Sequence, residues 1–205
     1  MTSFIPIHSR LLSLGFKLIA GVDEVGRGPL AGPLVAAAVV LKKDTIIPNL
    51  KDSKLLSEQE REKLYPEIIK ASQDYAITFI SHKVIDELNI LNSTRLANHL
   101  CVQALSKKPD LVLIDGRDKQ YLATKYQTII KGDQKVKEIA AASVLAKVAR
   151  DKLMKHYSKL YKNYKLEVNK GYGTRSHIGS IRKYGPSDIH RKSFTIKPQQ
   201  LSIEL

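Results

Sequence analysis

Apolar residues fall into short runs separated by polar or glycine-rich segments, a pattern that predicts several strands. Residues 18–23 and 34–41 are two apolar runs joined by a loop with three glycines and two prolines, which predicts a strand hairpin. Residues 75–80 and 126–130 are rich in β-branched and aromatic side chains and predict two further strands. The apolar run within residues 110–116 predicts a strand that is buried on both faces.

The segments between these strands have features of helices. Ser57 and Glu60 have the spacing of a capping box, which predicts a helix that ends near residue 72. Further helices are expected over residues 84–106, with a break near 89–92, and over residues 136–161. The order of elements is typical of an α/β domain. In the last helix, six residues are expected to face the core: Ala140, Val144, Val148, Leu153, Tyr157 and Leu160.

The two ends of the chain differ from this pattern. A short helix through Leu11, Leu12 and Leu14 is expected near the start. From residue 162 the chain is polar and basic, with a short helix expected from Ser176 to Tyr184 and a mobile tail after Pro198. We therefore predict a catalytic domain over residues 1–161 and a helical appendage over residues 162–205 that together form a single functional unit.

Charge and composition narrow the class of protein. The chain of 205 residues carries 34 Lys and Arg against 20 Asp and Glu, a formal net charge of +14 that favours a polyanionic partner, above all nucleic acid. A generally basic surface would be the alternative. The lone Cys101 excludes an intrachain disulfide and is expected in the core, and no apolar run reaches the length of a membrane span. We expect a cytoplasmic protein without a signal peptide.

Four acidic residues occur near the ends of predicted strands or beside glycines: Asp23, Glu24, Asp115 and Asp133. Strand ends of one sheet can meet in space, and packed carboxylates repel one another unless cations hold them. Because all the ligands are oxygens, Mg²⁺ or Mn²⁺ is the expected metal. Such a cluster could hold two ions and hydrolyse a phosphodiester bond.

Each acid also has a simpler interpretation. Asp115 could form an Asx turn, and Asp133 could cap the long helix. Asp23 and Glu24 are neighbours, so in a regular strand they would point to opposite faces, and both serve one site only if the strand bends. A fifth acid, Asp151, is rejected because Lys147 and Lys155 lie one helical turn away on either side and are expected to pair with it.

The glycine loop permits another hypothesis, that of a dinucleotide-binding protein. Residues 26–31 match the spacing of the Gly-rich fingerprint, and Asp44 lies near the position of the ribose-binding acid. However, the fingerprint requires a crossover helix directly after the loop. The apolar run that begins at Leu34 leaves no room for one, so a hairpin is the better interpretation.

Several motifs together resemble those of one nuclease family. The stretch Asp-Glu-Val-Gly-Arg-Gly-Pro-Leu-Ala-Gly-Pro is similar to the signature of the type 2 ribonucleases H, the ribonuclease HII family of bacteria. Six further motifs of the family follow in the family's order. The matching segments are residues 23–33, 51–55, 114–116, 131–133, 139–151, 170–174 and 190–194.

The resemblance implies a ribonuclease H-like mixed sheet flanked by helices, with a small helical C-terminal appendage. It implies a metal-dependent endonuclease for the RNA strand of RNA–DNA hybrids and for ribonucleotides embedded in duplex DNA, leaving 3′-hydroxyl and 5′-phosphate ends. A monomer is expected. The resemblance assigns metal binding and catalysis to Asp23, Glu24, Asp115 and Asp133, ribose recognition to Gly26, Arg27 and Gly28, a sugar contact to Tyr172, and phosphate contacts to Lys54 and Ser143.

Two alternatives remain from the same features. A relative of the same fold could cut DNA, but a glycine loop placed to sense a 2′-hydroxyl argues against this, because that group distinguishes RNA from DNA. A hybrid-binding protein without catalysis is the other, and four acids without metal would repel its phosphates.

Overall fold

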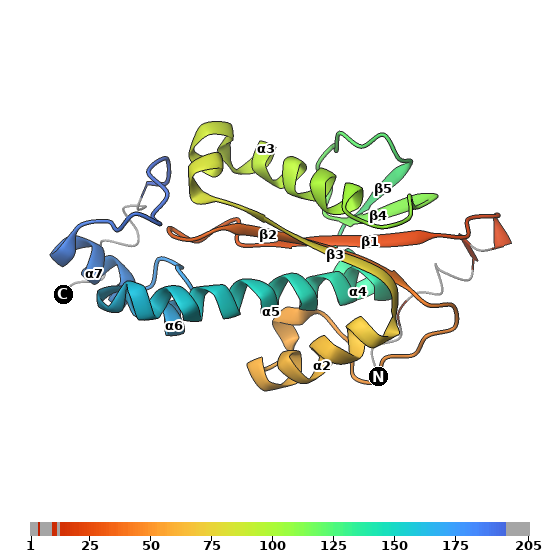
Figure 1. Ribbon diagram of the computed structural model, residues 1–205, viewed down its shortest axis with the longest axis horizontal. Helices are drawn as coiled ribbons and strands as arrows, with labels where there is room; N and C mark the ends of the chain where they lie inside the picture. Colours follow the sequence, from red (N-terminus) through yellow and green to blue (C-terminus); the bar gives the residue numbers. More distant parts are fainter. Residues whose placement is uncertain (1–3, 5–9, 12, 196–205) are drawn as a thin grey trace.

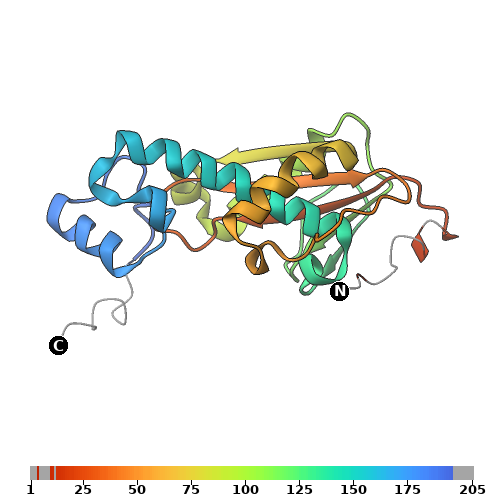
Figure 2. The same ribbon diagram turned by 90° about the horizontal axis from the view of Figure 1, so that it is seen from below.

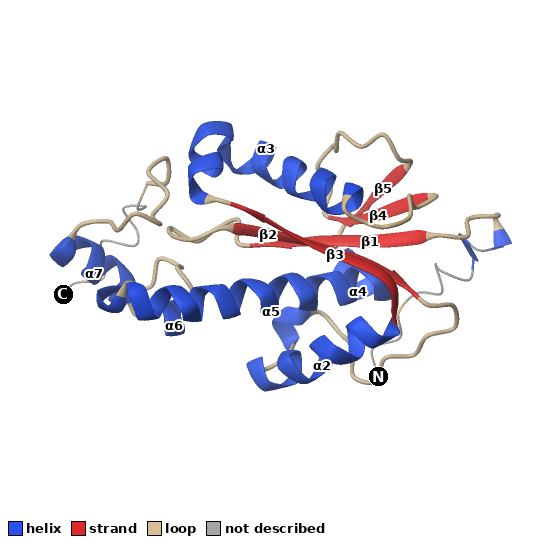
Figure 3. Cartoon of the chain, in the orientation of Figure 1, coloured by secondary structure: helices blue, strands red, loops and turns tan. Residues whose placement is uncertain are grey.

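The protein is built around one mixed β-sheet, described by a computed structural model that covers residues 4, 10–11 and 13–195. The five strands lie in the order β3–β2–β1–β4–β5 (Figure 1, Figure 3). β2 pairs antiparallel with β1 and β3, whereas β4 pairs parallel with β1 and β5. The strands are β1 Ile19–Val25, β2 Leu34–Leu41, β3 Ser72–Ile80, β4 Leu111–Asp115 and β5 Tyr126–Ile129.

Helices cover both faces of the sheet. α3 (His82–Gln103) lies on one face, and α5 (Lys137–Leu160) lies on the other with α2 (Glu58–Ala71) beside it (Figure 1, Figure 2). The alternation of side chains along β2 divides the core accordingly, because Ala36 packs on the α3 side and Val35 on the α5 side. The buried β2 therefore lies at the centre of a three-layer α/β/α structure.

The local sequence signals that were expected to start and break helices do so. Ser57 caps α2, and its side chain and that of Glu60 form the reciprocal bonds of a capping box. α3 is kinked at Asn89, which has a φ of 64°. Cys101, on the buried face of α3, lies in the core, as predicted. Among the described residues no helix is long and apolar enough to cross a membrane.

The connection from β1 to β2 is a tight loop. Residues 26–33 contain no helix, so the crossover required for a dinucleotide-binding unit is absent and that hypothesis is wrong. β1 lies against α5 so closely that a Cβ on Gly21 would stand 2.2 Å from the backbone carbon of Glu138. Only glycine leaves room for this close approach. The contact holds β1 against α5, the helix that carries Ser143.

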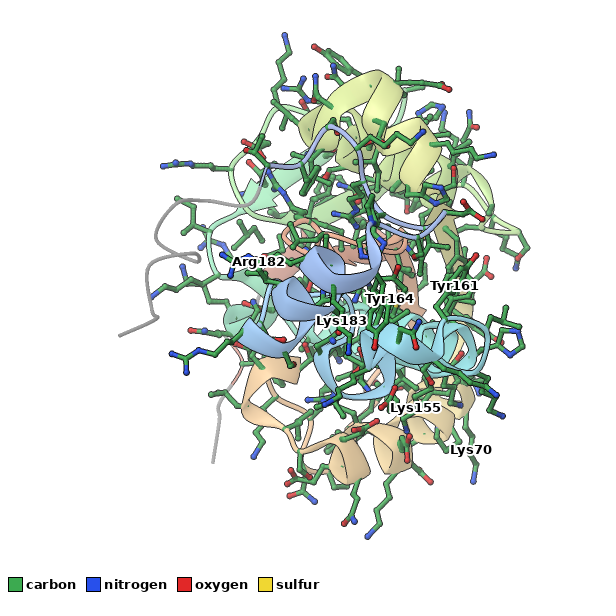
Figure 4. All side chains as sticks on the ribbon, turned by 90° about the vertical axis from the view of Figure 1, so that its left-hand side faces the viewer. Lys70, Lys155, Tyr161, Tyr164, Arg182 and Lys183 are labelled. Carbon is green, nitrogen blue, oxygen red and sulfur yellow. The ribbon has the colours of Figure 1, made fainter. Side chains whose placement is uncertain are left out.

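The segment after α5 packs on the end of the sheet-bearing body. α7 (Arg175–Tyr184) ends at Tyr184, as predicted, with Gly185 at its C-cap, and Ala31 of the hairpin loop forms an isolated bridge with His190. Figure 4 looks onto this end, where Tyr164 lies beneath α7 and Arg182 and Lys183 lie on its last turn. The remaining short helices are η1 Ser53–Leu55, α4 Gly132–Lys135, η2 Lys162–Tyr164 and α6 Leu166–Asn169.

Two expectations fail or cannot be compared. The predicted apolar stripe of α5 is confirmed at Ala140, Val144 and Val148, which are buried in the core, and is wrong at Leu160, which is 65% exposed. The stripe is also not a single face, because residues 139–146 are all buried between the sheet and α2. Met154, which the stripe omitted, is fully buried. Leu12, within the short helix expected near the start, and the tail after Pro198 lie outside the described residues.

Candidate active site

Three carboxylates converge at one end of the two central parallel strands. Asp23 lies on β1 and Asp115 ends β4, and the pairing of Val22 with Ile114 places the two acids side by side. Both belong to the set of residues that face α5, because Ile19 and Leu113 of the same parity pack against that helix. With Asp133 they offer one oxygen each, and these oxygens all lie within 4.8 Å of one another.

Asp133 reaches the cluster from a short helix of its own. α4 begins after Lys131, which has a left-handed φ of 56°, and the Gly132 amide donates a 2.7 Å hydrogen bond to Asp115 Oδ1. The N-cap position of α5 is Val136, so Asp133 does not cap the long helix and that interpretation is wrong. The turn at residues 131–132 thus directs Asp133 toward the end of β4.

Burial and mutual repulsion make this cluster electrostatically unstable without a cation. Burial raises the pKa of Asp23 well above its ordinary value, and the charges of Glu24 and Asp115 raise it further. Burial also raises the pKa of Asp133, with Asp115 adding to the effect. Asp23 and Asp133 are buried and Asp115 is half-buried, and together the three carboxylates are a donor set that fits a hard divalent ion such as Mg²⁺ or Mn²⁺.

Glu24 is not one of the three converging carboxylates, but it lies close enough to interact with them: burial and the charge of Glu24 raise the pKa of Asp23, and burial and the charge of Asp115 raise the pKa of Glu24. It has the parity of Ala20 and Val22, which pack on the α3 side of the sheet, and its Oε1 accepts a 3.3 Å hydrogen bond from Arg27 Nη1. Arg27 also pairs with Asp118 at 3.3 Å. Burial raises the pKa of Glu24, and Arg27 partly offsets this. The role of Glu24 as a metal ligand stays a prediction, as do the roles of the other site residues.

Lys54 and Ser143 both lie at the cluster. The exposed Lys54 ammonium is 3.1 Å from Asp133 Oδ2. Ser143 is buried, and its hydroxyl bonds to the Asp23 side chain and lies 2.7 Å from the Ser53 hydroxyl. Ser143 therefore supports a carboxylate directly, and a phosphate contact would have to share that hydroxyl.

Sequence reasoning missed two residues that support Lys54, namely Asp52 and Gln134. Asp52 accepts a 2.9 Å hydrogen bond from the Lys54 amide and a 3.1 Å bond from Gln134 Nε2. It thereby ties η1 to α4, the two short helices that carry Lys54 and Asp133. The position of Asp52 within the matched motif at residues 51–55 was the available signal.

The glycine loop is held from beneath by two buried arginines that sequence reasoning also missed. Arg191 donates to the carbonyls of Gly26, Arg27 and Gly32 at 2.6–3.1 Å. Arg150 donates to Pro33 O at 2.9 Å and to Ala31 O at 3.2 Å. The sequence alone cannot distinguish such a buried structural arginine from an exposed arginine that binds phosphate, because only the fold reveals burial.

Tyr172 lies beside this loop. A Cβ built on Gly28 would stand 3.8 Å from the Tyr172 ring, and 38% of the tyrosine is exposed. The Arg150 guanidinium lies 5.8 Å from the centre of the ring. The loop and the tyrosine predicted to read the sugar are therefore neighbours in space.

Asp151 lies apart from the three-carboxylate cluster. Lys147 pairs with it at 2.8 Å, as predicted, and Arg61 lies at 4.0 Å. The expected partner Lys155 instead pairs with Glu58 at 2.8 Å and Glu62 at 3.2 Å. The prediction for Lys155 is wrong because α2 offers it acids closer than the next turn of its own helix does.

Comparison with solved structures of similar fold identifies the class of protein. The chain superimposes on ribonuclease H2 from Pyrococcus horikoshii OT3 with a TM-score of 0.75 and 27% identity, over 87% of this chain and 94% of that one. It also shares its fold with Bst ribonuclease HIII, solved in complex with Mn²⁺, at a TM-score of 0.65 and 20% identity over 91% and 70% of the two chains. The mixed sheet with its helices is a ribonuclease H-like fold, as the motifs predicted.

Sequence comparison then specifies the family. The model of the family Ribonuclease HII matches residues 20–197. Ribonuclease HII of Caldicellulosiruptor saccharolyticus is 48% identical over 192 residues, which cover 94% of each chain. The chain belongs to the ribonuclease HII family and is an enzyme of the ribonuclease H type.

Proposed function

We propose that the enzyme hydrolyses the RNA strand of RNA–DNA hybrids and incises 5′ of ribonucleotides embedded in duplex DNA, leaving 3′-hydroxyl and 5′-phosphate ends. The observation that carries this proposal is the convergence of Asp23, Asp115 and Asp133 within 4.8 Å, in a chain whose glycine loop adjoins Tyr172. The first feature fits phosphodiester hydrolysis, and the second fits recognition of a sugar.

The acids would hold the metal. Asp23, Asp115 and Asp133, together with Glu24, would bind two Mg²⁺ or Mn²⁺ ions. When bound, such ions supply an activated water and stabilise the leaving oxygen of a phosphodiester. Ser143 orients Asp23, and the Gly132 amide orients Asp115, so the protein fixes these carboxylates before substrate arrives.

Lys54 would contact a phosphate oxygen of the substrate. Its side chain is 76% exposed even though its ammonium lies 3.1 Å from Asp133. A flexible, exposed ammonium can exchange a carboxylate partner for a phosphate at small cost. Asp52 holds the backbone beneath it, which keeps the ammonium near the cluster.

The hairpin loop would recognise ribose through its backbone. The carbonyls of Gly26 and Arg27 point toward Arg191, so the N–H groups of the same trans peptide units, on Arg27 and Gly28, point the opposite way. Such amides can donate to a 2′-hydroxyl, the group that distinguishes RNA from DNA. This supports RNA cleavage over the alternative of a DNA-cutting relative.

We also propose that residues 1–161 and the appendage at 162–205 act as one functional unit. Support comes from the Ala31–His190 bridge and from the bonds of Arg191 to the hairpin loop. Deletion of the appendage would therefore remove both Tyr172 and the support of the ribose-recognition loop.

Three labelled duplexes test the proposed activity: a long RNA–DNA hybrid, a DNA duplex with one ribonucleotide, and its all-DNA counterpart. We expect metal-dependent cleavage of the first two, none of the third, and loss of cleavage with a chelator. Binding of hybrid without cleavage at saturating Mg²⁺ and Mn²⁺ would instead favour a non-catalytic protein. Cleavage of all-DNA duplex would favour the DNA-cutting alternative.

Tyr172 gives a sharper prediction at the single ribonucleotide. Its ring would pack on the sugar that follows the ribonucleotide, where an added 2′-hydroxyl would crowd it. We expect Tyr172→Ala to lower incision there by about tenfold or more, because it removes the ring that packs on the sugar; tenfold corresponds to about 1.4 kcal/mol of lost transition-state stabilisation. Tyr172→Phe keeps the ring and should retain most activity. Equal losses in the two variants, measured as kcat/KM, would contradict a stacking role.

A further inference from the structure

Two adjacent residues near the end of the described chain, His190 and Arg191, connect to both predicted recognition elements. Arg191 is 3% exposed and donates to the carbonyls of Gly26 and Arg27 in the hairpin loop. His190 is 5% exposed and contacts His177, which in turn contacts the carbonyl of Tyr172. These bonds go to backbone carbonyls of the two loops or join the two histidines to each other, so they serve the loops themselves.

The hydrogen bonds of the two histidines determine their tautomers. His190 Nδ1 lies 2.9 Å from the Ser187 amide and 2.8 Å from the Ser187 hydroxyl, both of which can donate to it, and these contacts are shorter than its 3.3 Å approach to the Ser187 carbonyl, so we assign the His190 proton to Nε2. His177 Nδ1 lies 2.9 Å from the Tyr172 carbonyl and must donate to it. His177 Nε2 is then the acceptor for His190 Nε2–H at 3.1 Å. The result is a directional chain from Ser187 through both rings to Tyr172.

The surroundings of the pair keep it neutral and fixed. The Tyr164 ring centre lies 5.0 Å from that of His190, and His177 is fully buried. Burial lowers the pKa of His177, and burial together with His177 lowers the pKa of His190 to about 4. Two neutral rings can share one N–H between them, whereas two charged rings cannot.

The backbone joins the two loops where these side chains meet. The Leu30 amide donates to Gly171 O at 2.8 Å, and the Arg191 amide donates to Leu30 O at 2.8 Å. A Cβ on Gly171 would stand 2.4 Å from Ala31 O, so the loops approach as closely as glycine allows. Small displacements of either loop would therefore change the distance between the hairpin amides and Tyr172.

We propose that Arg191, and His190 acting through His177, are positioning residues that set Tyr172 at a fixed distance from the ribose-recognition loop and so determine specificity for a single ribonucleotide. This inference rests on the proposed function of that loop. A long hybrid presents a 2′-hydroxyl at every sugar of the RNA strand. A single ribonucleotide requires the loop and Tyr172 to read two consecutive sugars together. Loosening their spacing should therefore damage incision at the junction more than cleavage of hybrid.

The measured quantity is the junction ratio, defined as kcat/KM for the single-ribonucleotide duplex divided by kcat/KM for a long hybrid. Both reactions use the same acids, so the ratio cancels changes in the chemical step. His177→Gln places its amide near the Nε2 position and loses the bond to Tyr172 O, whereas His177→Asn retains a donor near Nδ1. We expect His177→Gln to lower the ratio by about tenfold, because the hydrogen bond to the Tyr172 carbonyl is lost. His177→Asn keeps a donor for that carbonyl and should lower the ratio by only about twofold.

Arg191→Lys keeps the charge but cannot bridge several carbonyls, and it should lower the junction ratio about tenfold as well. A stability control is Ile178→Val, a buried change in α7 that removes one methylene and none of the hydrogen bonds that join the two loops, and it should leave the ratio unchanged. In a Tyr172→Ala background, His177→Gln should have no further effect on the ratio, because its only route to the substrate is gone.

Long-range ¹H–¹⁵N correlation spectra of the wild-type enzyme test the tautomers without any variant. We expect His177 protonated on Nδ1 and His190 on Nε2. Opposite tautomers, an unchanged ratio in both His177→Gln and Arg191→Lys, or additive losses in the Tyr172→Ala background would each overturn the inference. Failure of the wild-type enzyme to incise at a single ribonucleotide would be a different result, since it would refute the proposed function itself.

Discussion

Asp115 and Asp151 are both carboxylates on regular elements, yet their surroundings give them different roles. Asp115 has two carboxylate neighbours and one amide, whereas Asp151 pairs with Lys147 at 2.8 Å. We expect Asp115→Asn to lower kcat by more than about a hundredfold, because changes to groups that only orient metal ligands already cost about ten- to a hundredfold. Asp151→Asn should stay within a few-fold of wild type. Wild-type turnover by Asp115→Asn at saturating Mg²⁺ would contradict the site.

Repulsion in the cluster gives a prediction for stability. Asp23 has a pKa raised above its ordinary 3.8, so as pH rises past that value the unfolded chain releases a proton that the folded chain retains. The cost to the metal-free fold is absent below that pH and grows until pH passes the raised pKa. Asp23→Asn should therefore raise Tm by a few degrees at pH 7 in chelator, but not near pH 4. Thermal unfolding at both pH values measures this, and a lower Tm at pH 7 would refute it.

At the scale of elements, Gly21 lies where β1 packs against α5 with no room for a side chain. We expect Gly21→Ala to destabilise the fold by about 3 kcal/mol, because its Cβ would meet the α5 backbone at 2.2 Å and neither element can yield. Gly179→Ala is the matched control: nothing lies within 4 Å of a Cβ in the middle of α7, so stability should rise by about 0.5–1 kcal/mol. Urea unfolding of both variants compares the two sites directly.

The elements could be predicted from the sequence wherever their signals are local. The capping box at Ser57 and the kink at Asn89 depend on a few neighbouring residues, and both are confirmed. The burial of α5 could not be predicted in the same way, because a helix packed between a sheet and α2 loses the exposed face that periodicity assumes.

The acids of the candidate site could be predicted from the sequence, but the arginines that hold the hairpin loop could not. Asp23, Asp115 and Asp133 are marked by strand ends and a glycine turn, and the structure brings them together. Arg150 and Arg191 have no comparable sequence signal. The residues next to a buried arginine that bonds to backbone carbonyls do not differ in kind from those next to an exposed arginine. Such roles depend on contacts between residues that are distant in sequence.

For the whole molecule, the net charge of +14 predicts binding that weakens steeply with salt through counterion release. Lys54→Ala should reduce the slope of log Kd against log salt by about one, as expected for one lost phosphate contact. Lys107→Ala is the control: it lies in the loop that enters β4, at the opposite end of that strand from Asp115. Titration with a catalytically inactive variant measures both, and a salt-independent affinity would contradict a phosphate-dominated interface.

α5 contacts both the carboxylate cluster and the hairpin loop, at two points along its length. Ser143 bonds to Asp23, and Arg150, seven residues later, bonds to the loop carbonyls. That separation is about 10 Å of helix, and inserting one residue would shift Arg150 by about 1.5 Å and turn it by about 100°. The helix therefore fixes the distance between the carboxylate cluster and the hairpin loop. Between Ser143 and Arg150, substitutions of side chains preserve this spacing, whereas an insertion or a deletion changes it.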